Sequence, residues 1–73
     1  MIGYSYRIRK LNRAADKRNI GVQLGRICID SEIPVKTVME KLKVSKQTVY
    51  NWFFGIHVPG PKHAKKIQDY FLS

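Results

Sequence analysis

The chain has 73 residues, and its 14 lysines and arginines against 5 acidic residues give it a formal net charge of +9. A chain of this length forms one domain and is too short for a large enzyme pocket, and its charge predicts a polyanionic partner, nucleic acid before others. There is no signal-peptide pattern and no apolar run near the roughly 20 residues that span a bilayer, so we expect a protein of the cytoplasm.

Residues 1–19 are predicted to form an amino-terminal arm ahead of a helical domain at residues 20–73. The first apolar side chains of the arm alternate with small and basic ones, and they are Ile2, Tyr4, Tyr6 and Ile8. This period of two predicts an extended segment able to pair with another strand. From Lys10 to Arg18, apolar residues instead recur at helical spacing, which predicts a short helix there.

The arm carries the densest positive charge of the chain. Asp16 is its one acidic residue, and its basic residues are Arg7, Arg9, Lys10, Arg13, Lys17 and Arg18. This composition fits a solvated basic tail as well as an arm that follows DNA or enters the minor groove. In the second case, Arg7, Arg9 and Arg13 contact the DNA backbone.

The stretch from Gly21 to Ser31 is predicted to be the next helix, because Leu24, Ile27 and Cys28 form one apolar stripe. Residues 30–34 connect it to the following element, and Ile33 is expected to enter the core. Cys28 is the one cysteine of the chain and cannot form an internal disulfide, so it is interpreted as a small buried hydrophobic residue.

Two short amphipathic segments separated by a three-residue break follow. The first carries an apolar stripe of Val35, Val38, Met39 and Leu42, with Pro34 suited to its first turn. After the break, Ser45 is a good N-cap for a helix beginning at Lys46. In that helix the residues expected to face the core are Val49, Trp52 and Phe53. This spacing is typical of a helix-turn-helix.

The opposite side of the second segment is rich in groups that hydrogen-bond base edges. Its predicted base-contacting residues are Lys46, Gln47, Thr48, Tyr50 and Asn51. Amide side chains pair with adenine, and a lysine reaches the acceptors of guanine. One polar helix face is most often simply solvated, but the spacing, the cap and the basic charge together favour DNA. Backbone contacts are expected from Lys36, Lys43, Ser45 and Lys62.

The chain is predicted to end in one more helix. Gly55 is suited to end the preceding helix, residues 56–60 form a loop, and Pro61 begins the last helix. Its inward residues are Ala64, Ile67 and Phe71, and its outward ones are Lys62, Lys65, Lys66 and Gln68. The two histidines, His57 and His63, form no close-spaced ligand pair with each other or with Cys28, so we expect no metal, no cofactor and no enzymatic activity.

The segment VKTVMEKLKVSKQTVYNWFFG resembles the helix-turn-helix of the lambda-repressor-like family, which includes phage repressors and Cro proteins. It is especially similar to small phage-encoded regulators with a QTVYNWF.G signature, and the resemblance runs from about Gly21 to Phe71. It implies an all-α bundle of four or five short helices that binds double-stranded DNA and regulates transcription. It also implies a place in the cytoplasm of a bacterial host, at the nucleoid when bound.

Three positions depart from the pattern of that family. Met39 stands where a small residue is usual, and Lys43 stands where glycine is frequent. The turn is therefore expected either to be wider or to hold a non-glycine residue in the left-handed conformation. Val35 replaces a glutamine that touches phosphate in many members, so Lys36 or a backbone amide would take over that contact.

Two other functions fit the same composition. The bundle and its basic arm could dock on an acidic protein such as a polymerase and inhibit it. The arm could instead bind RNA, with Tyr4 and Tyr6 stacking on bases. Whether the chain forms a homodimer is left open by the sequence.

Overall fold

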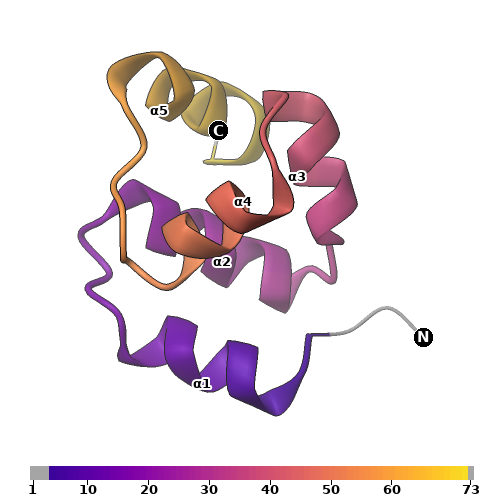
Figure 1. The fold of residues 1–73 in the computed structure, drawn as a ribbon, viewed down its shortest axis with the longest axis vertical. Helices are drawn as coiled ribbons and strands as arrows, with labels where there is room; N and C mark the ends of the chain where they lie inside the picture. Colours follow the sequence, from indigo (N-terminus) through magenta and orange to yellow (C-terminus); the bar gives the residue numbers. More distant parts are fainter. Residues whose placement is uncertain (1–3, 73) are drawn as a thin grey trace.

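The computed structural model describes residues 4–72, and this part of the chain is entirely helical, without a strand (Figure 1). The all-α prediction is thereby confirmed. Five α-helices are followed by one π-helical turn: α1 (Tyr6–Ala14), α2 (Ile20–Asp30), α3 (Val35–Leu42), α4 (Lys46–Phe53), α5 (Pro61–Ile67) and η1 (Gln68–Leu72). None of these helices is long and apolar enough to cross a membrane.

Helices α2 and α4 cross at the centre of the bundle, with α1 on one side of them and α3 and α5 on the other (Figure 1). Two glycines one turn apart on α2 permit this crossing. A Cβ atom on Gly21 would lie 2.7 Å from the Cβ of Trp52, and one on Gly25 would lie 2.8 Å from the Cγ of Phe53. Because real Cβ contacts are longer than this, α4 can approach α2 so closely only where α2 has no side chain.

The hydrophobic core draws on α2, α3, α4 and α5. Its buried members are Leu24, Cys28, Val35, Val38, Leu42, Val49, Trp52, Phe53 and Ile67. Cys28 is fully buried, as predicted, and burial raises the pKa of its thiol to about 12 because the apolar surroundings disfavour the thiolate. Ile33, Met39 and Phe71 are partly buried against this cluster. The predicted apolar stripes face the core except at Ile27 and Ala64, which are half-buried outside this cluster.

The amino-terminal segment differs from its prediction. The extended segment predicted from the period-two pattern is wrong at Tyr6 and Ile8, because both residues lie in α1. Ile2 is outside the described residues. The predicted helix of this region exists, but it begins at Tyr6 rather than Lys10 and ends before Ala15. Ser5 explains the early start, since its hydroxyl accepts a hydrogen bond from the Ile8 amide at 3.2 Å and caps the helix. Residues 4–72 contain no strand, so no strand pairing of this segment occurs within the described chain.

Helix α1 is fixed to the rest of the bundle by a buried amide. The side-chain nitrogen of Asn12 donates to the carbonyl oxygens of Val22 (3.1 Å) and Phe53 (2.8 Å), on α2 and α4. Just ahead of α1, the Tyr4 hydroxyl donates to the carbonyl of Ile33, and its ring packs against Phe53 with 6.0 Å between centroids. Residues 4–14 thus contact three other parts of the chain.

The remaining helix ends follow the sequence signals closely. Asn19 caps α2 through its side-chain oxygen, which accepts from the Gly21 amide at 2.8 Å. Gly55 adopts a left-handed conformation (φ 75°) just after α4, as a helix stop requires. Pro61 is the first residue of α5, where its missing N–H costs nothing. Gly55 and Pro61 were predicted as the end of one helix and the start of the next, whereas the Asn19 cap was not predicted. The predicted last helix is divided into α5 and η1, which contains Phe71.

Candidate nucleic-acid interface

Helices α3 and α4 have eight residues each and are joined by the three residues Lys43, Val44 and Ser45. Lys43 is left-handed (φ 54°, ψ 52°), so the second of the two turn geometries expected from the sequence is present. Val44 is partly buried against the core. The hydroxyl of Ser45 accepts from the Thr48 amide at 3.2 Å, which confirms the predicted cap. The turn therefore holds the start of α4 in a defined position.

The inner side of α4 is anchored on two sides. Val49, Trp52 and Phe53 are buried, and the Trp52 ring lies 5.3 Å from the ring of His63 on α5 while its backbone contacts Gly21 on α2. Burial of these three side chains determines which residues of α4 point outward.

Gln47 and Asn51 lie at the centre of the outer side of α4. The Gln47 side-chain nitrogen donates to the side-chain oxygen of Asn51 at 3.0 Å, so the two amides stand next to each other one turn apart. Gln47 is exposed and Asn51 is half-buried. After this bond, Gln47 keeps its oxygen and Asn51 keeps its nitrogen for other partners. Together the two amides offer both a hydrogen-bond acceptor and hydrogen-bond donors to a ligand that binds at α4.

The other three predicted base-contacting residues differ in the contacts that they make within the protein. Lys46 is exposed, and its ammonium lies 6.0 Å from the centre of the Tyr50 ring. Tyr50 is half-buried and stacks on Phe54, with centroids 5.6 Å apart and planes 14° apart. The Thr48 hydroxyl lies 3.0 Å from that of Ser45 and is engaged in the cap. Lys46 is thus the freest of the three.

A groove of about 400 Å³ runs between α1 and α4. Arg7, Ile8 and Leu11 line it from α1, Lys46, Gln47 and Tyr50 line it from α4, and Phe54, the C-cap of α4, also lines it. The structure therefore brings Arg7 to the side of the predicted base-contacting residues. Sequence analysis missed this groove, although Ser5 as a cap and the spacing of Ile8, Asn12 and Ala15 are signals for a packed helix.

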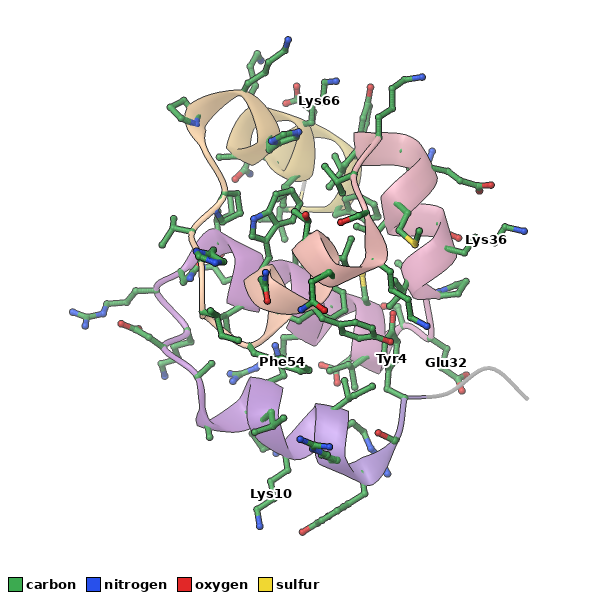
Figure 2. The ribbon with its side chains drawn as sticks, in the orientation of Figure 1. Tyr4, Lys10, Glu32, Lys36, Phe54 and Lys66 are labelled. Atoms are coloured by element: carbon green, nitrogen blue, oxygen red, sulfur yellow. The ribbon has the colours of Figure 1, made fainter. Side chains whose placement is uncertain are left out.

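The predicted backbone-contacting residues do not all share the α4 surface. Lys43, Ser45 and Lys62 are exposed at the turn after α3, at the N-cap of α4 and at the start of α5. Lys36 is exposed on α3 and extends away from the bundle, as Lys10 and Lys66 do on α1 and α5 (Figure 2). Arg9 and Arg13 line a different hollow, between α1 and α2, and are not brought together with Lys46 or Gln47.

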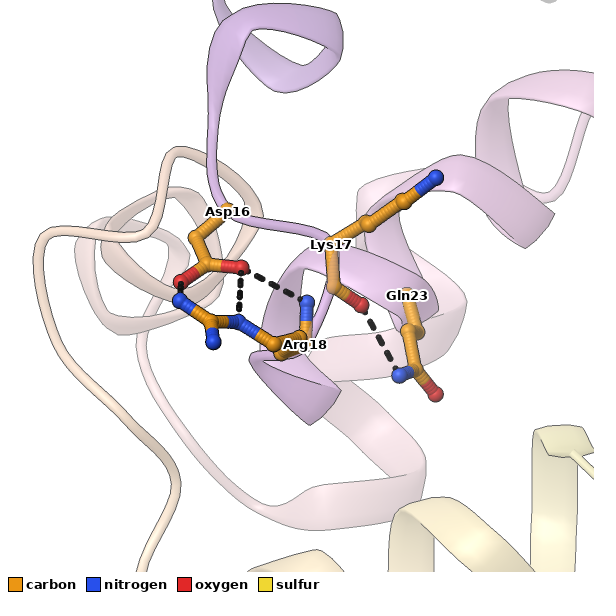
Figure 3. Close-up of polar contacts among 4 residues, drawn as sticks. All are labelled: Asp16, Lys17, Arg18 and Gln23. Carbon is orange, nitrogen blue, oxygen red and sulfur yellow. Dashed lines mark hydrogen bonds and ion pairs between the residues drawn. The ribbon is translucent and has the colours of Figure 1, made fainter.

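One arginine of the amino-terminal region is neutralised by its neighbour. The Arg18 guanidinium contacts both carboxylate oxygens of Asp16, at 3.2 and 3.0 Å, and its backbone amide adds a third bond at 2.9 Å (Figure 3). These hydrogen bonds lower the pKa of Asp16. Lys17 uses its backbone carbonyl to hold Gln23 at 2.9 Å, while its side chain points away from these contacts (Figure 3). Arg18 therefore contributes little net charge to this region.

Within residues 4–72, no three histidine, cysteine or acidic side chains gather in a way that could hold a metal ion. Comparison of the chain with known protein families, curated proteins and solved structures finds no match. The resemblance to the lambda-repressor-like family therefore remains a prediction from the motif residues, and the candidate interface is described from the geometry of α4 alone.

Proposed function

We propose that the protein is a sequence-specific binder of double-stranded DNA in which α3 and α4 form a helix-turn-helix and α4 reads the major groove. The observation that carries this proposal is the pair of adjacent amides, Gln47 and Asn51, on the outer side of a helix whose inner side is buried in the core. Regulation of transcription, in the manner of phage repressors and Cro proteins, is proposed on the resemblance of the motif.

The chemistry of the surface supports this proposal. Glutamine and asparagine match the donor and acceptor edge of adenine, and lysine matches the two acceptors of guanine. Lys46 begins α4 and Gln47 follows it, so both belong to the turn that a recognition helix points at the bases. Arg7 lies beside α4 in the groove, and the exposed Lys36 belongs to α3, the other helix of the motif; both are proposed to contact phosphates.

Specificity is the test that separates base contact from simple charge attraction. Preferred duplexes would be selected from random DNA, and their affinity would be compared with that of random duplex by fluorescence anisotropy. Gln47→Ala should lose about 1 to 3 kcal/mol of discrimination at one base pair. Lys36→Ala should weaken all duplexes alike, and Lys10→Gln serves as a charge control away from α4. If Gln47→Ala and Asn51→Ala both retain the full specificity ratio, α4 is not the reading helix.

Salt dependence tests the phosphate contacts. If about six phosphates are neutralised, the logarithm of the affinity should fall with the logarithm of salt concentration with a slope of about −5. Removing one phosphate contact, as in Lys36→Ala, should reduce the slope by about 1. A slope near zero would contradict duplex binding.

The groove between α1 and α4 favours one second candidate, the inhibitor that docks on an acidic protein. Ile8, Leu11 and Phe54 give the groove apolar walls, and Arg7 and Lys46 lie at its sides. An apolar residue flanked by acidic ones would suit this chemistry. Leu11→Asp should abolish such binding while leaving duplex specificity in place, which distinguishes the two functions. RNA stacking is less supported, because Tyr4 is packed on Phe53 and only Tyr6, 71% exposed, remains accessible.

A further inference from the structure

A second basic surface lies on the other side of α1 from the candidate reading surface. It is a hollow of about 270 Å³ between α1 and α2, lined by Arg9, Asn12, Arg13, Arg26, Ile29 and Asp30. Three guanidinium groups stand against one carboxylate there. We call it the arginine hollow.

Helix geometry explains why the arginine hollow is separate from the groove beside α4. With about 100° of rotation per residue, Arg9 lies about 200° round α1 from Arg7, and Arg13 lies about 200° round it from Leu11. Arg7 and Leu11 line the groove beside α4, and Arg9 and Arg13 line the arginine hollow. A straight duplex seated on α4 therefore leaves the arginine hollow uncovered.

The cations of the hollow are available to an external anion. Among residues 4–72, the ion pairs formed are Arg18 with Asp16 and Lys65 with Asp69, and neither involves the hollow. Arg9 and Arg13 are exposed. Arg26 is half-buried, and one nitrogen of its guanidinium is shared by the carbonyls of Asn12 and Arg13, each at 3.4 Å. Both contacts are long for hydrogen bonds, and they leave the other N–H groups of the guanidinium free to donate.

We propose that the arginine hollow binds the phosphodiester backbone of a second duplex segment, so that one molecule bridges two stretches of double-stranded DNA. Charge complementarity selects this occupant, since planar guanidinium groups bind phosphate oxygens in pairs and are less strongly hydrated than lysine. The nitrogen of the one amide that lines the hollow, Asn12, is engaged with the Val22 and Phe53 carbonyls, so we assign this second contact to phosphates and expect it to be independent of sequence. The inference rests on the proposed duplex binding by α4.

Bridging is measured by mixing the full chain with two duplexes, one immobilised and one fluorescent, and recording capture of the second by the first. Arg9→Gln combined with Arg13→Gln should reduce the captured fraction about tenfold and lower the log–log salt slope of capture by about 2. Binding of a single duplex at α4, measured by anisotropy, should keep its specificity ratio. Asp30→Asn should raise capture, because it removes the one carboxylate of the hollow. Circular dichroism checks that each variant is folded.

The matched control removes the same charge elsewhere. Lys10→Gln combined with Lys66→Gln also lowers the net charge by two, at exposed or half-buried positions that extend away from the bundle (Figure 2). Equal loss of capture in this control and in the arginine variant would mean that net charge alone is responsible, which overturns the proposal. Capture that survives the arginine variant would also overturn it and would indicate a dimer that uses two copies of α4. Absence of any single-duplex binding would instead refute the proposed function itself.

Discussion

The side-chain nitrogen of Asn12 donates a 2.8 Å hydrogen bond to the main-chain carbonyl of Phe53, the last residue of α4. A carbonyl at the end of a helix has no partner within that helix, so Asn12 supplies what α4 lacks. Asn12 is 2% exposed and is the one buried polar residue in the described part of the chain. The amino-terminal helix therefore completes the helix proposed to read DNA.

Replacing Asn12 by alanine should destabilise the protein by about 1 to 3 kcal/mol, because the Phe53 carbonyl is left buried without a donor. Urea unfolding followed by circular dichroism measures this change. Asn12→Asp should cost more at neutral pH, where the carboxylate cannot donate, and should recover part of the loss when acid protonates it. Lys10→Ala, on the exposed side of α1, is the control and should change stability by less than about 0.5 kcal/mol. An Asn12→Ala protein as stable as the control would show that this bond is not formed in solution.

Gly25→Ala should destabilise the protein, because Gly25 lies where α2 and α4 cross. The Cβ of the alanine would lie 2.6 Å from the Asn12 side-chain nitrogen and 2.8 Å from the Phe53 ring. The expected cost is about 1 to 3 kcal/mol from overpacking, partly offset by the roughly 1 kcal/mol that alanine gains over glycine in a helix. Gly60→Ala is the matched control, since no atom lies within 4 Å of its Cβ position. Thermal melts of the two variants should therefore differ clearly, and equal melting temperatures would contradict the close crossing.

Tyr4 tests whether the segment ahead of α1 belongs to the folded structure. Tyr4→Phe removes the hydrogen bond to the Ile33 carbonyl but keeps the ring on Phe53, so it should cost about 0.5 to 1.5 kcal/mol. Tyr4→Ala also removes the ring and should cost more. Tyr6→Ala is the control, because Tyr6 is 71% exposed. If neither Tyr4 variant differs from the control in chemical denaturation, the contacts of Tyr4 with Ile33 and Phe53 contribute nothing to the stability of the fold.

The stability of the protein should fall at high pH because of Cys28. Its folded-state pKa is about 12 and its ordinary value is 9.0, so below pH 9 the thiol is protonated in both states and has no effect. Above pH 9 the unfolded state ionises first, and the free energy of unfolding drops by up to about 1.4 kcal/mol per pH unit until pH 12. Burial also raises the pKa of Tyr4, which acts in the same direction.

Two measurements check the role of Cys28. Denaturant unfolding at a series of pH values should give a shallower decline for Cys28→Ala than for the unaltered chain. In the native protein at pH 8, a thiol reagent should label Cys28 only slowly, and labelling should become fast when the protein is unfolded. Rapid labelling of the native protein would show that the core opens readily.

The helices from α2 onward could be predicted because each carries an apolar stripe and a recognisable end signal, such as Ser45 before α4 and Pro61 at the start of α5. Helix α1 was mistaken for a strand at its beginning because Tyr6 and Ile8 alternate with basic residues. That pattern is local, whereas the packing of α1 depends on Asn12, a polar residue that no apolar stripe includes. Its two acceptors, on Val22 and Phe53, are distant in the sequence.

The candidate site could be predicted only in part, because apolar periodicity indicates which face of a helix is buried but not how two helices are oriented against each other. Helical periodicity correctly indicated that Gln47 and Asn51 face away from the core, because their positions follow from those of Val49 and Trp52. It could not indicate that Arg7 lies beside them while Arg9 lies on the far side of α1, since that depends on how α1 is rotated against α2 and α4. A charge count for residues 1–19 treats these arginines as equivalent, and only the tertiary packing separates them.

Helix α3 has a left-handed, non-glycine residue close to each end, Glu32 (φ 55°) before it and Lys43 (φ 54°) after it. Each costs on the order of 1 kcal/mol or more relative to an ordinary conformation, and Pro34 at the N-cap offers no side-chain hydrogen bond. Packing of Val35, Val38, Met39 and Leu42 on the core must therefore supply most of the stability of α3. Its amide protons should consequently exchange with solvent through local opening before those of α2, so a helix that opens more readily than α2 lies directly next to the helix proposed to read DNA.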